Sequence, residues 1–235
     1  MLTKAEKQLY NEAADIINAA VANSRNEFEY LVYVHDEIVR RATYTTGLKQ
    51  NDTAYGALME GRADCDGYAD ALYLLCNLAG MECHYQHGNA RDRQGDTGHM
   101  WNGVKLGGAF YCTDVTWNDT DQSTAVPLYA YLNMGRQQTA DCYTWNESAA
   151  MFAPARDGET YSYYRIRGTA FDTVEEAAIY INRYAPGQGT VNLKVAMQGM
   201  REEDAVDALM AEINIGGRYV HKAASGWLYV LFTAK

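Results

Sequence analysis

The segment from about Cys65 to Ala79 has an apolar face too broad for a helix at the surface of a protein. Its apolar positions recur at helical spacing and extend beyond one stripe: Ala69, Leu72, Cys76 and Ala79, widened by Tyr68, Leu75 and Leu78. Such a face predicts a central, largely buried helix. Asp64 suits its N-cap, and Gly80 suits the position just after its end. The chain must therefore fold so that other elements cover this helix.

Other segments predict the elements that surround this helix. Helices are predicted at 3–22 and 27–41, and strands at 82–87, 99–106 and 109–116, with a polar loop at 89–97. After a linker at 146–160, strands at 161–167, 190–197, 218–223 and 227–232 alternate with helices at 173–184 and 202–213. We therefore expect an α+β domain over 1–150 and a small C-terminal α/β sandwich of βαβαββ order over 160–235, whose role is open.

Composition argues against several classes of function. The formal net charge of −10 disfavours nucleic acid or an anionic membrane as partner. No apolar run approaches the roughly 18 residues of a membrane span. The polar start, Met1–Tyr10, is unlike a signal peptide, and the compartment stays open. The five cysteines lack metal-binding spacing, so we expect no metal and no other cofactor.

Three short motifs supply the parts of a nucleophilic cysteine site. They are Asp-Cys-Asp-Gly-Tyr-Ala at 64–69, Gly-His-Met-Trp-Asn at 98–102 and Asp-Val-Thr-Trp at 114–117. In the first turn of a helix, Cys65 would lie beside unpaired backbone N–H groups that favour a thiolate and can bind an oxyanion. The negative charges of Asp64 and Asp66 oppose the thiolate. A positively charged imidazole nearby is therefore required.

Strand register predicts where the imidazole and the carboxylate lie. Gly107-Gly108 suits a two-residue hairpin turn in which Leu106 pairs with Ala109. In that register His99 and Asp114 are diagonal neighbours on one face of the sheet, close enough for their side chains to meet. A carboxylate that holds one ring nitrogen leaves the other nitrogen free to serve the thiol.

These motifs, in this order, resemble those of the transglutaminase-like superfamily, most closely its bacterial branch. The similarity covers roughly residues 30–145 and includes Ala-Tyr-Gly-Ala-Leu at 54–58. It implies a papain-like core with the cysteine at the start of a central helix and the histidine and aspartate on adjacent antiparallel strands. By that match Cys65 is the nucleophile, His99 the general base and acid, and Asp114 the orienting carboxylate.

The resemblance also implies a reaction, acyl transfer through a thioester on protein, peptide or cell-wall-type substrates. Tyr55, Asp66 and Trp101 are the candidates for the oxyanion or substrate pocket. Hydrolysis by a cysteine peptidase or amidase is favoured over transfer to an amine, which would cross-link proteins. A catalytically silent module that binds protein or glycan is the alternative from another class, and a zinc hydrolase built on Cys65 and His99 is a third.

Overall fold

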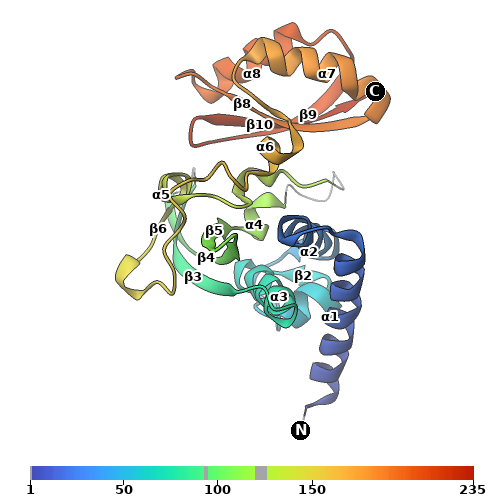
Figure 1. Ribbon diagram of the computed structural model, residues 1–235, viewed down its shortest axis with the longest axis vertical. Coiled ribbons are helices and arrows are strands. Elements are labelled where there is room, and N and C mark those ends of the chain that lie inside the picture. Colours follow the sequence, from blue (N-terminus) through green and yellow to red (C-terminus); the bar gives the residue numbers. More distant parts are fainter. Residues whose placement is uncertain (1, 93–94, 120–125) are drawn as a thin grey trace. The chain divides into compact units, whose positions relative to one another are not determined.

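The computed structural model describes residues 2–92, 95–119 and 126–235 (Figure 1). The chain divides into two compact units. Unit 1 consists of Met1–Pro127 and Tyr131–Gly158, and unit 2 of Leu128–Ala130 and Glu159–Lys235. In the described ranges, none of the helices combines the length and the apolar character needed to cross a membrane.

Unit 1 contains helices followed by an antiparallel sheet and short connecting elements. In chain order they are α1 (Lys4–Asn23), α2 (Glu27–Arg41), β1 (Thr43–Tyr44), the π-helical turn η1 (Gly56–Glu60), β2 (Arg62–Ala63), α3 (Cys65–Leu78), β3 (Cys83–Asp92), β4 (Gly95–Leu106), β5 (Ala109–Thr113), α4 (Val115–Asn118), α5 (Arg136–Cys142), β6 (Tyr143–Thr144) and η3 (Glu147–Ala149). The 3₁₀ turn η2 (Tyr129–Tyr131) joins residues of both units. The main sheet has the order β5-β4-β3-β6, and β1 pairs with β2 in parallel.

The three long helices of unit 1 begin at residues that can cap them. Thr3 and Asn26 accept backbone N–H groups at the starts of α1 and α2. Asp64 does the same at α3, and Gly80 follows the end of α3 with a φ of 82°. A positive φ is accessible to glycine without strain, so the chain can leave the helix there. The predicted helices, the Asp64 cap and the Gly80 stop are confirmed.

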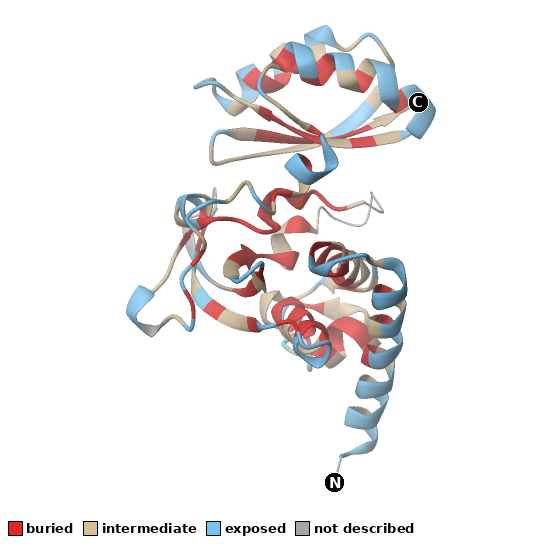
Figure 2. Ribbon diagram, in the orientation of Figure 1, coloured by how far each residue is buried: buried red, intermediate tan, exposed pale blue. Residues whose placement is uncertain are grey.

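α3 is enclosed by other elements of unit 1, as its broad apolar face requires. The Asn102 side chain on β4 donates to the Ala69 carbonyl at 3.1 Å. On the α2 side, the Tyr30 hydroxyl donates to the Leu75 carbonyl at 2.8 Å. Half of the α3 residues are buried, whereas α1 is exposed along its outer side (Figure 2). The central helix is therefore fixed between α2 and the sheet.

β3 and β4 are longer than the sequence predicts. β3 and β4 pair continuously from Cys83 with Val104 to Asp92 with Gly95. The expectation of a polar loop at 89–97 is therefore wrong, except for residues 93 and 94, which lie outside the described ranges. Backbone pairing within a long hairpin outweighs the low strand propensity of these polar residues, because such propensity depends strongly on context.

In unit 2, the two longer of three helices cover one face of a four-stranded sheet (Figure 1). Its elements are α6 (Tyr163–Arg167), β7 (Ala170–Phe171), α7 (Val174–Gln188), β8 (Thr190–Ala196), α8 (Glu202–Glu212), β9 (Gly217–Ala224) and β10 (Trp227–Ala234), with the sheet order β7-β8-β10-β9. Alternate residues of β8 and β10, such as Leu193 and Val230, face a buried cluster that includes Ile181 and Leu209 of the helices. Each helix thereby buries one apolar face against the sheet.

The expected first strand of this unit, at 161–167, is wrong. Most of that segment forms α6, and the first strand is the shorter β7. Gly168 ends the helix with a φ of 69°, and Thr169 N donates to the Tyr164 carbonyl at 2.8 Å. The alternation of aromatic and polar residues resembles a strand, but only one of the α6 residues, Tyr164, is buried. A single helical turn closed by a glycine explains why the segment is not a strand and why only Tyr164 is buried.

Candidate active site

Cys65 is the first residue of α3, and the turn that holds it is tightly built. The Asp64 carboxylate accepts N–H groups of Asp66 and Gly67 at 3.1 and 3.2 Å, and the Asn51 amide at 2.5 Å. A Cβ at Gly67 would overlap the Asn51 carbonyl oxygen, so this position needs glycine. Cys65 is partly exposed, whereas the other four cysteines are buried. It is therefore the thiol that solvent and a substrate can reach.

His99 of β4 is joined directly to a fully buried carboxylate. Its Nε2 lies 2.7 Å from Oδ2 of Asp114, whose side chain is 0% exposed. Asp114 also accepts the Tyr143 hydroxyl at 2.7 Å on Oδ2 and the Trp117 N–H at 3.0 Å on Oδ1. Three donors thus stabilise one buried charge, which burial without partners would strongly disfavour. With Nε2 bound to Asp114, the other ring nitrogen of His99 is left for the thiol.

Electrostatics connect the three groups. Burial lowers the pKa of His99, but the charge and hydrogen bond of Asp114, and then the hydrogen bond and charge of Cys65, raise it to about 10. Burial raises the pKa of Asp114, but the charge and hydrogen bond of His99 and the bonds from Tyr143 and Trp117 leave it below its usual value. The arrangement therefore favours an imidazolium between a carboxylate and the sulfur.

Aromatic rings surround the imidazole. Tyr143 stacks parallel to His99 at 6.0 Å between ring centres, and Trp117 lies tilted at 5.4 Å. Trp101 stacks on Tyr143 at 4.3 Å and is 1% exposed. Trp101, a candidate for the substrate pocket, thus belongs to the core behind His99 rather than to an open wall. Trp117 is partly exposed and remains accessible beside the ring.

The other two candidates for the pocket lie differently with respect to Cys65. Oδ1 of Asp66 is 3.6 Å from the sulfur, so this carboxylate is next to the thiol. Tyr55 precedes η1, and within the described residues no hydrogen bond joins it to Cys65; its role stays a prediction. Instead, Tyr44 is close enough for the charge of Cys65 to raise its pKa, after the larger effect of burial. Tyr44 is 54% exposed and pairs with Ala63, two residues before Cys65.

The predicted hairpin register is confirmed, but the ladder ends early. β4 and β5 pair from Leu106 with Ala109 to Asn102 with Thr113. The expectation that the strand continues to residue 116 is wrong, because Asp114 is the N-cap of α4. Asp114 therefore contacts His99 from a helix cap rather than from an adjacent strand.

Two contributors to the site could not be recognised in the sequence. Tyr143 lies on β6, where the sequence predicts no strand, and β6 reaches the site because it pairs with β3. Asn118 ends α4 and is fully buried. The only available signal was that Asn118 directly follows the third motif. Within the described residues, no group of three or more His, Cys, Asp or Glu side chains could hold a metal ion.

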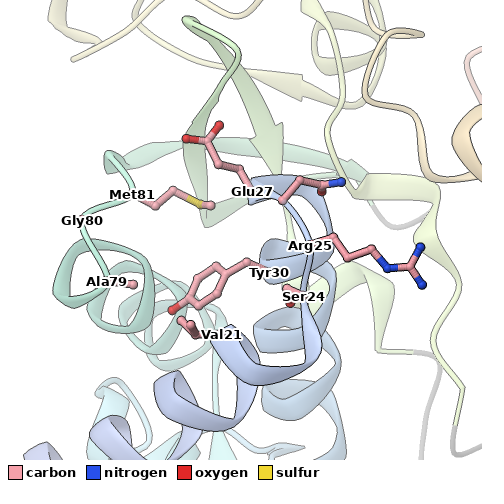
Figure 3. A pocket seen from close by; sticks show the side chains of 9 residues that line it. Val21, Ser24, Arg25, Glu27, Tyr30, Ala79, Gly80 and Met81 are labelled. Carbon is pink, nitrogen blue, oxygen red and sulfur yellow. The ribbon is translucent and has the colours of Figure 1, made fainter.

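A separate pocket of about 300 Å³ lies between the start of α2 and the turn after α3 (Figure 3). Val21, Tyr30 and Met81 form its apolar part, and Arg25 and Glu27 stand at its rim. It adjoins the end of α3 opposite Cys65, and a helix of 14 residues is about 20 Å long. This pocket is therefore not part of the candidate site.

Comparison with known proteins agrees with this geometry. Residues 14–122 match the family model of the transglutaminase-like superfamily. This part of the chain is therefore similar in sequence to that superfamily. The matched segment contains α3, β4 and α4, and with them all three motifs. The resemblance read from the motifs is thereby confirmed.

Individual relatives are more distant. Kyphoscoliosis peptidase of Homo sapiens is 31% identical over 81 residues, which cover 30% of this chain and 12% of that protein. The Mus musculus protein is 30% identical over the same length. The chain thus matches only about an eighth of the length of these curated relatives. A crystal structure of a TGase matches with a TM-score of 0.44 and 12% identity, over 52% of this chain and 35% of that chain.

Proposed function

We propose that this protein is a cysteine hydrolase that cleaves protein or peptide amides through Cys65, His99 and Asp114. The observation that carries the proposal is one connected set of groups: a partly exposed thiol at a helix start, an imidazole that interacts with it, and a buried carboxylate 2.7 Å from that imidazole. A module that only binds would gain nothing from burying Asp114 behind His99, because a buried charge is costly unless it is paired.

In the proposed reaction, the Cys65 sulfur attacks the amide carbonyl carbon while the imidazolium of His99 stabilises the thiolate. The carbonyl oxygen becomes an oxyanion, and the Cys65 backbone N–H, which precedes the first bond within α3, can donate to it. The C–N bond breaks, and His99 gives its proton to the departing amine. Water then attacks the thioester, gives a proton to His99, and releases the acid and the Cys65 sulfur.

Similarity to kyphoscoliosis peptidase supports hydrolysis of a peptide bond over transfer to an amine. The two outcomes use the same three residues, since they differ only in the nucleophile that attacks the thioester. Cell-wall-type peptides are included in the proposed substrate class, because their amide bonds need the same chemistry.

The first test is the reactivity of the thiol. The protein is titrated with iodoacetamide across pH, and mass spectrometry locates the modified cysteine in the native chain and in His99→Ala. We expect selective alkylation of Cys65 at neutral and mildly acidic pH, which fades in the variant. Alkylation of several cysteines only at alkaline pH would contradict the proposal. Cleavage of a peptide library, compared with incorporation of a fluorescent primary amine, then separates hydrolysis from cross-linking.

A further inference from the structure

A buried histidine outside the proposed triad connects α2 to the segment that carries Asp114. His35 is 0% exposed, and so is Asn118 at the end of α4. The two side chains meet at 3.0 Å, between Nε2 of His35 and Nδ2 of Asn118. On its other side, Nδ1 of His35 lies 2.9 Å from Asp36 Oδ1. Both groups are polar and fully buried, so their hydrogen bonds must offset the loss of water.

The backbone decides which atom donates in this contact. Tyr131 N lies 2.8 Å from Oδ1 of Asn118, and a backbone N–H can only donate, so the amide oxygen faces Tyr131. The amide nitrogen of Asn118 must then face His35 and donate to Nε2. Nε2 therefore carries no proton, and the proton of a neutral His35 sits on Nδ1, where it is donated to Asp36. The orientation of Asn118 and the tautomer of His35 are thus fixed together.

Asn118 and Tyr131 both hold the backbone of Asp114. The Asp114 N–H donates to the Tyr131 carbonyl at 2.9 Å, and Asn118 N donates to the Asp114 carbonyl at 3.3 Å. The same Tyr131 residue therefore contacts Asn118 through its N–H and Asp114 through its carbonyl. An unbroken series of bonds leads from His35 through Asn118 and Tyr131 to Asp114, and from there to His99.

α4 by itself cannot hold Asp114 in one direction. It has four residues, and a helix of that length is not stable without tertiary contacts. Its direction must come from the groups that anchor its ends, which include the Asp114 cap, the Asn118 amide and the bond from the Tyr68 hydroxyl to Asp119. A small rotation of this turn would move the carboxylate away from Nε2 of His99, and hydrogen bonds weaken steeply with such misalignment.

We propose that His35 and Asn118 are positioning residues, which act through Tyr131 and the α4 turn to aim the Asp114 carboxylate at His99. This proposal rests on the proposed function for its meaning, since it assigns the two residues to the same site. It differs from a purely structural role in one respect. An apolar pair of similar size could fill the same space, but only the hydrogen-bonded pair fixes the angle of the turn.

Two variants remove the acceptor at Nε2 and leave the Asn118 amide oxygen for Tyr131. His35→Leu replaces the ring by a branched apolar chain, and His35→Phe keeps a ring of similar size. His35→Gln offers an amide oxygen in place of Nε2 and should restore the contact. Tyr30→Phe is the matched control, because it removes another buried hydrogen bond of α2, the one to Leu75, without touching the α4 turn.

The measurements are the pKa of His99 from its ring-proton NMR signals and the rate of Cys65 alkylation by iodoacetamide at pH 7. In His35→Leu and His35→Phe we expect the pKa of His99 to fall by about one unit, because a misaligned Asp114 carboxylate stabilises the imidazolium less, and alkylation of Cys65 to slow by more than about twofold. His35→Gln and Tyr30→Phe should stay within about twofold of the native rate.

Unchanged values for both measurements in a folded His35→Leu or His35→Phe protein would overturn the positioning role. So would equal losses in Tyr30→Phe, since they would show a general loss of stability. If His35→Leu does not fold, His35→Phe provides the same test with a ring of similar shape. The pKa of His99 does not require a reactive thiol, so failure of the proposed function and failure of this inference can be distinguished.

Discussion

Removing the Tyr143 hydroxyl tests the buried carboxylate most directly. In Tyr143→Phe, Oδ2 of Asp114 loses a donor at 2.7 Å and keeps only His99. A hydrogen bond to a charged group contributes about 1.5–3 kcal/mol, so the variant should lose about 2 kcal/mol of stability. For a unit of this size that corresponds to a fall in Tm of about 4–8 °C. The pKa of Asp114 should rise, because the Tyr143 bond favours its charged form.

The assay is urea denaturation followed by tryptophan fluorescence, with the pKa of His99 measured by NMR in parallel. Three of the four tryptophans, Trp101, Trp117 and Trp145, belong to unit 1, so the signal reports mainly on that unit. Two control variants separate the causes. Tyr10→Phe changes an exposed hydroxyl and should leave stability within about 0.5 kcal/mol. Tyr85→Phe removes a hydrogen bond to a different carboxylate, Asp70, and should lower stability without changing the pKa of His99.

The reasoning would be refuted by a Tyr143→Phe protein that unfolds within about 0.5 kcal/mol of the native chain. Such a result would mean that water or a rearranged backbone satisfies Asp114 equally well. The reasoning would also be refuted if Tyr85→Phe changed both the free energy of unfolding and the pKa of His99 as much as Tyr143→Phe does. The pKa of His99 would then follow any loss of stability, not the loss of this hydrogen bond. The assigned contact is supported only if the pKa of His99 changes in Tyr143→Phe and does not change in Tyr85→Phe.

Three further variants test the site and its scaffold. The pKa of His99 is raised from 6.5 to about 10, so the stability that it contributes is full below pH 6.5 and is lost as pH rises through 10. In His99→Gln, the free energy of unfolding measured with urea should therefore not show this decline. If the variant and the native chain lose stability equally over this pH range, the raised pKa is contradicted. In Asp66→Asn, the ratio of the rates at which Cys65 reacts with a cationic and with an anionic methanethiosulfonate should fall about fivefold. The reason is that removing one nearby negative charge changes the difference between the two activation free energies by about 1 kcal/mol. An unaltered ratio would show that the charge of Asp66 is screened. Gly88→Ala places a Cβ against the Thr144 carbonyl and should destabilise unit 1 by about 1–3 kcal/mol by thermal unfolding, whereas an unchanged Tm would mean that β6 can shift freely.

The elements that could be predicted from sequence are those whose signals are local. The predicted cap at Asp64 and stop at Gly80 mark the ends of α3 by chemistry within one turn. The hairpin register followed from Gly107-Gly108 because a two-residue turn fixes which residues face each other. In each case a few neighbouring residues determine the outcome, so no knowledge of the rest of the fold was needed.

Contacts between distant segments could not be predicted in the same way. Tyr143 reaches Asp114 because β6 pairs with β3 through Asn89 and Ala90, and neither segment carries a mark of that pairing. The short strand β6 has two residues, too few for an alternation to be seen. The prediction of a strand at α6 failed for a related reason. Its five residues fit both the helical and the strand period, and Gly168 after them ends a helical turn. Short elements are determined by what they pack against.

Asp114 shows how a local rule can give a correct contact for an incomplete reason. The register predicted that Asp114 and His99 share a face, and the carboxylate does lie 2.7 Å from the imidazole. However, the ladder stops at Thr113, and Asp114 turns away from β4 to cap α4. A residue that caps a helix points its side chain back toward the first turn, which constrains it more than a strand position would. The direction of Asp114 therefore depends on a four-residue turn, and that turn depends on Asn118 and His35. For this reason the buried pair of His35 on α2 and Asn118 on α4 is the place where a substitution outside the triad should alter the site most.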